Sequence, residues 1–132
     1  MISQEGPGWR LAWDPLKEKF PILLGGEGWA FELAEAEWET LVQLVFDLTT
    51  EHQQIKSQLM EEESVRLEME KEFWWGCLEG DKDNWTLQVI LQPYESNIRA
   101  VEAFWTCASA KKFSSAMRMM WDSYQGLGNL MA

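Results

Sequence analysis

The first part of the chain alternates between apolar and polar positions with the period of two that is typical of strands. Trp9, Leu11 and Trp13 share one face of a strand predicted at residues 9–13. A short apolar run predicts a second strand at residues 22–24, and residues 29–33 alternate again. The glycine-rich stretch at residues 25–28 is typical of a hairpin turn. We expect residues 1–8 to form an irregular lead-in.

The period then changes, and residues 35–60 are predicted to form a long helix. Apolar positions recur there in alternating steps of three and four, which is the heptad rhythm of helices that pair. A helix of about 25 residues would be roughly 40 Å long, more than a compact domain of this size covers. We therefore expect a homodimer or larger homo-oligomer that pairs through this helical seam. The seam consists of Trp38, Leu41, Val45, Leu48, His52, Ile55 and Leu59.

Period two returns over residues 64–77, which we interpret as one long strand that bends or carries a bulge. One face of it would carry Val65, Leu67, Met69, Phe73, Trp75 and Cys77, and the other Arg66, Glu68, Glu70, Glu72 and Trp74. A turn at residues 80–84 leads to strands at residues 85–91 and 97–105. A final helix is predicted at residues 107–124, followed by a loose tail at residues 125–132.

The predicted order is three strands and a helix, repeated once: β-β-β-α, then β-β-β-α. Short turns between consecutive strands favour antiparallel pairing, so the predicted class is α+β. A chain of 132 residues is typical of one domain, which we expect to span residues 9–124.

The chain is strongly acidic, with 22 acidic and 11 basic residues and a net charge of -11. Such a field repels nucleic acid and favours cationic partners. Between residues 27 and 83 there are 16 acidic residues against 4 basic ones. Residues 98–118 have the opposite balance, because only Glu102 is acidic there. The basic residues of that stretch form a candidate nucleic-acid patch: Arg99, Lys111, Lys112 and Arg118.

Nine tryptophans are present, and most of them fall on apolar faces of predicted strands or helices, where they would fill the core. Trp74 differs, because it points to the glutamate side of its strand. It is then covered by a second layer, buried between subunits, or exposed as a binding platform. In the last case Trp74, Glu68, Glu70 and Glu72 form a candidate partner surface, an apolar patch rimmed with acid.

Catalytic and metal-ligating patterns are absent from the sequence, so we expect no enzyme activity, no metal and no cofactor. His52, the only histidine, lies on the helical seam without other ligands at metal-site spacing. Cys77 and Cys107 lack the spacing of a redox or metal motif. No targeting segment and no apolar run of about 18 residues is present, so we expect a cytoplasmic protein without a membrane span.

Four stretches together resemble a known family: GWRLAWDP at residues 8–15, FPILLGGEGWAFELAEAEW at 20–38, QLMEEES at 58–64 and LEMEKEFWWGCLEG at 67–80. The family is a small uncharacterised one from cyanobacteria, the domain-of-unknown-function family numbered 1818. The similarity covers about residues 8–122. That family is similar in fold to the single-stranded-DNA-binding transcriptional regulators typified by plant Whirly proteins. The resemblance implies repeats of strands followed by a helix, with pairing through the helices.

Whirly proteins bind single strands through a lysine-bearing strand motif, KGKAAL, which has no counterpart in this sequence. The resemblance therefore carries no functional residue over to this chain. Taken together, the sequence predicts a small, acidic, non-catalytic protein-interaction module whose protein partner is unknown. The alternative is a single-stranded nucleic-acid-binding regulator that uses the candidate nucleic-acid patch.

Overall fold

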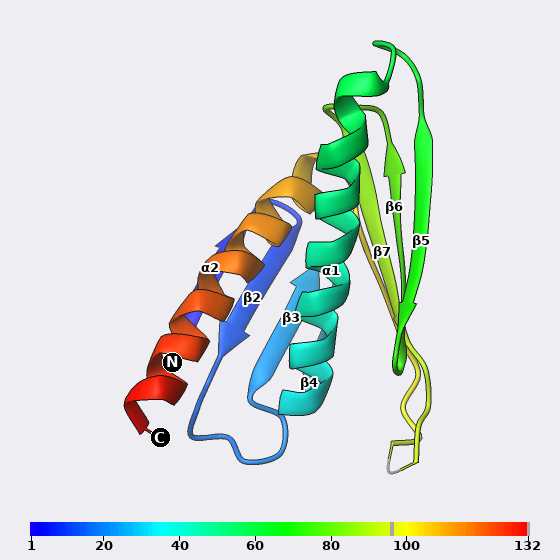
Figure 1. Cartoon of the computed structure of the whole chain (residues 1–132). Coiled ribbons are helices and arrows are strands. Elements are labelled where there is room, and N and C mark those ends of the chain that lie inside the picture. Colours follow the sequence, from blue (N-terminus) through cyan, green and yellow to red (C-terminus); the bar gives the residue numbers. More distant parts are fainter. Residues whose placement is uncertain (96, 132) are drawn as a thin grey trace.

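Two four-stranded antiparallel sheets and two long helices make up the fold (Figure 1). The computed structural model describes residues 1–95 and 97–131, with the side chains of the last helix described as far as Gly126. The first sheet contains, in order, β1 (Ile2–Gly6), β2 (Trp9–Trp13), β3 (Ile22–Gly26) and β4 (Trp29–Leu33). The second sheet contains β5 (Val65–Lys71), β6 (Trp74–Gly80), β7 (Trp85–Leu91) and β8 (Val101–Trp105).

A helix follows each sheet in the chain. Helix α1 (Glu35–Ile55) continues into a 3₁₀ turn (Lys56–Gln58), and helix α2 (Cys107–Met131) ends the described chain. The predicted α+β class and the repeat of strands followed by a helix are confirmed. Each unit has four strands where the sequence predicted three.

The extra strand of the first unit is β1, in the segment predicted to be an irregular lead-in. It pairs antiparallel with β2, from Ile2 opposite Trp13 to Gly6 opposite Trp9. Most of its side chains are exposed, because β1 is an edge strand. A strand that buries little needs no apolar alternation, so the pattern that reveals other strands is missing here.

The extra strand of the second unit arises because the predicted long strand is a tight hairpin. Strand β5 ends at Lys71 and β6 begins at Trp74, and these two residues face each other in the register. The turn carries no glycine, proline or asparagine, which are its usual markers. Instead Glu72 adopts a left-handed conformation with φ of 53°.

Element ends differ from the predictions in three further places. Helix α1 ends at Ile55 and gives way to the 3₁₀ turn, five residues before the predicted end at residue 60. Strand β8 begins at Val101, after an irregular connection. Helix α2 continues to Met131 through most of the predicted loose tail, and Ala132 lies outside the described residues.

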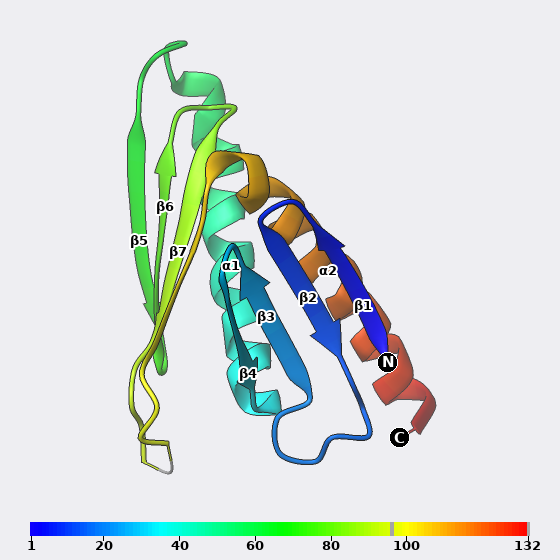
Figure 2. The same ribbon diagram turned by 180° about the vertical axis from the view of Figure 1, so that it is seen from behind.

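The two units are interleaved, since each helix packs on strands of the other unit. Helix α1, from the first unit, packs on β5 and β6 of the second sheet. Helix α2, from the second unit, packs on β1 and β2 of the first sheet and also on β7 and β8 (Figures 1 and 2). Gly76 in β6 allows α1 to approach closely, because a Cβ there would lie 2.8 Å from Leu44 Cδ2.

Trp105 joins the two sheets in a single core. Its indole Nε1 donates a hydrogen bond of 3.1 Å to the carbonyl oxygen of Gly25 in β3. Its ring stacks on Phe113 of α2 with the centroids 3.9 Å apart, and meets Trp29 of β4 edge to face at 5.3 Å. The first and second sheets and α2 therefore converge on one tryptophan.

Candidate functional site

The helical seam predicted to pair with a second copy is buried within one chain. Trp38, Leu41, Val45 and Leu48 are fully buried, and His52 is 4% exposed. Ile55 and Leu59 alone among the seven seam residues are half-buried. The prediction that this seam forms an oligomer interface is therefore wrong, because its side chains already belong to the core. The oligomeric state itself stays a prediction.

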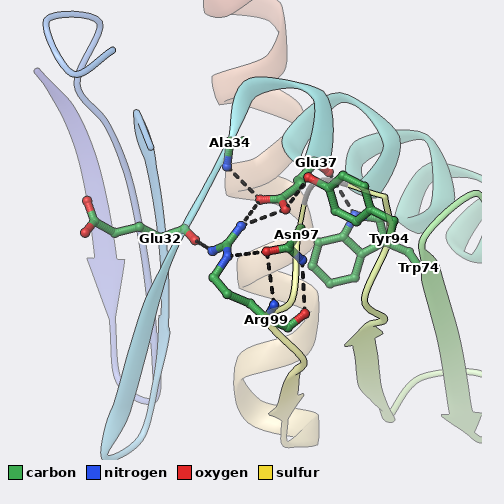
Figure 3. Close-up of polar contacts among 7 residues, drawn as sticks. All are labelled: Glu32, Ala34, Glu37, Trp74, Tyr94, Asn97 and Arg99. Carbon is green, nitrogen blue, oxygen red and sulfur yellow. Dashed lines mark hydrogen bonds and ion pairs between the residues drawn. The ribbon is translucent and has the colours of Figure 1, made fainter. Parts of the chain in front are cut away.

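Trp74 lies in the core as well, beneath α1. Its side chain is fully buried, and its indole Nε1 donates a hydrogen bond of 2.9 Å to the carbonyl oxygen of Glu37 (Figure 3). Of the three alternatives predicted for Trp74, the first is the one observed: a second layer, helix α1, covers the side chain. The predicted partner surface centred on Trp74 is wrong, and Glu72 lies at the hairpin turn, where its carboxylate accepts a hydrogen bond of 3.3 Å from the Thr40 hydroxyl.

Trp75, not Trp74, points outward beside the glutamates. The register places Glu70, Trp75, Ile90 and Glu102 in one row across the second sheet, from β5 to β8. The next row is Glu68, Cys77, Gln88 and Phe104. We call the surface formed by these two rows the outer face. Helix α1 covers the opposite side of the sheet, and no described helix covers the outer face (Figures 1 and 2).

The outer face has an apolar centre and an acidic border. Phe104 is 48% exposed, and Trp75 and Ile90 are half-buried. Beside them Cys77 is buried, and burial raises the pKa of its thiol. At the β5 edge Glu68 is exposed and forms an ion pair of 2.7 Å with Arg66. An apolar patch rimmed with acid therefore exists, one residue away from its predicted centre.

Arg99 belongs to a partly buried polar cluster and not to a nucleic-acid patch (Figure 3). Its Nη2 lies 2.6 Å and 2.7 Å from the two carboxylate oxygens of Glu37, which is fully buried in the first turn of α1. Its Nη1 donates to the carbonyl oxygen of Glu32 at 2.7 Å. The guanidinium also stacks on Phe20 at 4.4 Å. The contacts of Arg99 therefore connect the end of β4 to the start of α1.

The same cluster fixes the connection between β7 and β8. The hydroxyl of Tyr94 donates to Glu37 Oε2 at 2.7 Å, and Asn97 Oδ1 accepts from Arg99 Nε at 2.7 Å. Burial raises the pKa of Tyr94, and its hydrogen bond to Glu37 raises it further. The Ala34 backbone N–H donates to Glu37 Oε1 at 2.8 Å, which also caps α1. The cluster therefore ties Tyr94, Asn97 and Arg99 to the start of α1.

The other three residues of the predicted nucleic-acid patch, Lys111, Lys112 and Arg118, lie on the exposed side of α2. Two lysines from distant parts of the sequence lie close to them. A cleft of about 230 Å³ between α1 and α2 contains Lys56 from the 3₁₀ turn after α1 and Lys82 from the β6–β7 turn. We call it the basic cleft; it is lined by Thr49, His52, Gln53, Lys56, Lys82, Trp85, Lys111, Ser114, Ser115 and Arg118. Lys112 borders a neighbouring hollow that shares Lys111 and Ser115. The sequence held no signal for Lys56 and Lys82, because only the fold brings them to α2.

The remaining titratable residues form no metal centre in the described part of the chain. No three His, Cys, Asp or Glu side chains lie close enough together there to hold a metal ion. His52 Nε2 donates a hydrogen bond of 2.9 Å to the carbonyl oxygen of Asp81. Among the described residues, no helix is long and apolar enough to cross a membrane.

These features define a class: an α+β protein of two interleaved sheet-and-helix units. Residues 4–120 match the family model described as a domain of unknown function, DUF1818, and the chain belongs to that family. Its fold is similar to that of a solved structure from Prochlorococcus sp. NATL2A, described as a protein with unknown function from the DUF155 family. The two chains are 39% identical with a TM-score of 0.85, and the match covers 92% of this chain and 99% of the other.

No curated protein matches this chain. The family and the solved structure both carry unknown functions, so the expected similarity to Whirly-type regulators stays a prediction.

Proposed function

We propose that this chain is a non-catalytic interaction protein that binds a basic, extended segment of a partner protein on the outer face. The observation that carries the proposal is the arrangement of the two rows. Apolar Trp75, Ile90 and Phe104 lie in adjacent positions, and glutamates border them at both edges of the sheet. Contiguous exposed apolar patches with a polar rim are typical of protein-binding surfaces.

Charge selects the kind of partner. The chain carries a net charge of -11, and part of this negative charge lies on the outer face, with Glu68 and Glu70 at one edge and Glu102 at the other. A cationic segment would be attracted from a distance and would then pair with these carboxylates. A second copy of the same face is disfavoured, because it would bring like-charged rims together.

Trp75 and Phe104 are the anchors that we expect to contribute most of the binding energy. Large aromatic side chains near the centre of an interface commonly dominate its affinity, because they bury much apolar area with few rotatable bonds. The nearby glutamates would then set orientation and association rate more than affinity.

The test is a titration with a fluorescent peptide of alternating lysine and leucine, followed by anisotropy at low ionic strength. We expect Trp75→Ser to weaken binding by about thirtyfold, as loss of a hot-spot aromatic does. Met119→Ser removes a side chain that is 60% exposed on α2 and should leave the affinity unchanged. Absence of peptide binding, or equal weakening by both variants, would overturn the proposal.

The alternative function, a single-stranded nucleic-acid-binding regulator, has less support. Arg99 is held by Glu37, and the aromatic residue among the remaining cations, Trp85, is only 5% exposed. Proteins that bind single strands combine cations with exposed aromatic rings on which bases stack. Tight, salt-sensitive binding of single-stranded DNA would nevertheless replace the interaction proposal by this alternative.

Self-association and cellular location remain part of the proposal. Light scattering would distinguish a monomer of 15.4 kDa from the expected homodimer. We place the interaction in the cytoplasm of a cyanobacterium, and the Prochlorococcus source of the similar solved structure supports the organism group.

A further inference from the structure

The basic cleft is a concentration of positive charge on an acidic protein. Of the 11 basic residues in the chain, Lys56, Lys82, Lys111 and Arg118 line this one hollow, together with His52. No aspartate or glutamate is among its lining residues. The cations come from three separate parts of the fold: the 3₁₀ turn after α1, the β6–β7 turn and the first half of α2.

These cations are not neutralised by ion pairs with the described side chains. The described side chains form ion pairs through Lys17, Arg66, Lys71 and Arg99, and through none of the four cations of the basic cleft. Four like charges around a cavity of about 230 Å³ repel one another, which costs stability unless an anion binds between them.

The groups beside the basic cleft restrain the direction of its cations more than they neutralise their positive charge. The Arg118 guanidinium lies 4.4 Å from the centre of the Phe46 ring, so its direction is restrained. Asp81 precedes Lys82 in the β6–β7 turn and accepts hydrogen bonds from the backbone N–H groups of Asp83 and Asn84 at 2.9 Å and 2.7 Å. These bonds lower the pKa of Asp81, with smaller effects from His52 and Lys111. Its carboxylate is thus already occupied within its own turn.

We propose that the basic cleft binds a compact, multiply charged phosphate compound, such as inorganic pyrophosphate or the phosphate chain of a nucleotide. Lysine ammonium groups and an arginine suit the oxygens of phosphate, and several cations around one cavity match an anion of several charges. Ser115 and Gln53 line the same cavity and supply neutral hydrogen-bond donors. This site is separate from the outer face and does not depend on the function proposed for that face.

A compact ligand is favoured over a nucleic-acid strand. The cavity is small, and the buried Trp85 offers no open ring for base stacking. A strand would also have to leave the cleft across a surface whose overall charge is strongly negative.

The test is isothermal titration calorimetry of the full chain with inorganic pyrophosphate at low ionic strength, repeated with a single-stranded oligonucleotide. We expect pyrophosphate to bind with one site per chain. Lys82→Gln and Lys111→Gln should each weaken the binding by roughly tenfold, because each removes a charged hydrogen-bond donor. Lys19→Gln is the matched control, since Lys19 lies in the β2–β3 connection, away from the cleft, and should leave the binding unchanged.

Three outcomes would overturn the inference. The first is the absence of pyrophosphate binding to a protein whose circular dichroism spectrum shows it to be folded. The second is equal weakening by Lys19→Gln, which would show a general charge effect in place of a site. The third is tighter binding of the oligonucleotide than of pyrophosphate, which would assign the cleft to a nucleic-acid strand.

Discussion

Trp74 and Trp75 are neighbours in sequence with opposite environments. The sequence predicted Trp74 outside and Trp75 inside, and the structure reverses them. In a continuous strand Lys71, Phe73 and Trp75 would share a face, but the two-residue turn places Lys71 opposite Trp74 on the same face. Alternation revealed that two faces exist, but it could not reveal a hairpin whose turn lacks its usual residues.

This register predicts a large difference between two tryptophan substitutions. Trp74→Ala removes a fully buried ring and should cost about 3–5 kcal/mol of the free energy of unfolding. Trp75→Ala removes a half-buried ring from the outer face and should cost about 1 kcal/mol or less. Urea unfolding followed by circular dichroism measures both. A larger loss for Trp75→Ala would show that the register is wrong.

The left-handed Glu72 predicts that glycine is preferred over alanine at this turn. A side chain at φ of 53° is disfavoured by roughly 1–2 kcal/mol relative to glycine. Both Glu72→Gly and Glu72→Ala lose the contact with Thr40, so their difference isolates the backbone. We expect the glycine variant to be more stable by about 1 kcal/mol in urea unfolding. Equal stability would contradict the left-handed turn.

At the scale of elements, the predictions succeeded where the apolar period belongs to one uninterrupted element. They failed where a turn lacks its usual residues and where contacts join distant segments. The α1 helix, β2, β4 and β7 follow their patterns closely. The role of Arg99 could not be predicted, because its partner Glu37 lies 62 residues away and looks like an ordinary acidic residue at a helix start. Charge clustering along the sequence placed Arg99 with Lys111, Lys112 and Arg118, whereas the fold places it on Glu37.

The buried cluster predicts that Arg99 contributes to stability. Arg99→Met leaves the carboxylate of Glu37 buried without its cation, which should cost about 3–5 kcal/mol at most and less where water reaches the site. Arg10→Met, a change of the same kind at an exposed position in β2, should cost about 0.5 kcal/mol or less. Thermal and urea unfolding compare the two variants. Equal losses would mean that the cluster does not hold the β7–β8 connection.

The close approach of α1 to β6 predicts that Gly76 accepts no larger residue. Gly76→Val would press on Leu44 and Leu48, which are both buried, and should cost about 1–3 kcal/mol. Gly126 is the matched control, because a Cβ there meets nothing within 4 Å. Gly126→Ala should leave stability unchanged or raise it by up to about 1 kcal/mol. A tolerated Gly76→Val would argue against this packing.

At the scale of the whole molecule, the long apolar seam shows what an apolar pattern in the sequence can predict and what it cannot. The heptad rhythm predicted one continuous apolar stripe from Trp38 to Leu59, and α1 carries a buried stripe from Trp38 to His52. It could not show what covers that stripe, because a second copy and the chain's own remaining elements require the same side chains. The cover is intramolecular, because β5 and β6 pack on α1, and the helix of 21 residues is shorter than the one that we expected to need a second copy.

The free energy of unfolding should decrease at alkaline pH, because both tyrosine hydroxyls hold their protons more tightly in the folded state than in the unfolded state. Burial raises the pKa of Tyr94 and of Tyr124, and hydrogen bonds to Glu37 and to Glu35 and Glu39, respectively, raise them further. A raised folded pKa contributes stability that is complete below the unfolded value of about 10 and is lost as the pH rises above it.

The measurement is a pH titration that follows phenolate absorbance and circular dichroism together. We expect both tyrosines to ionise above their ordinary value and to do so as the protein unfolds. Tyr124→Phe should remove one of the two absorbance steps and reduce the alkaline loss of stability. Ionisation of both rings near pH 10 in a protein that stays folded would contradict the buried environments.

The interleaving of the two units has a consequence for how the protein forms during translation. When the ribosome has delivered the first sheet and α1, the strands on which α1 packs, β5 and β6, do not yet exist. The apolar stripe of α1 therefore stays exposed to solvent until the second half of the chain has left the ribosome. Neither half should therefore fold alone, whereas a chain cut in the exposed segment after the 3₁₀ turn should reassemble from its two fragments. The protein is a natural candidate for a split reporter whose halves regain structure only when they meet.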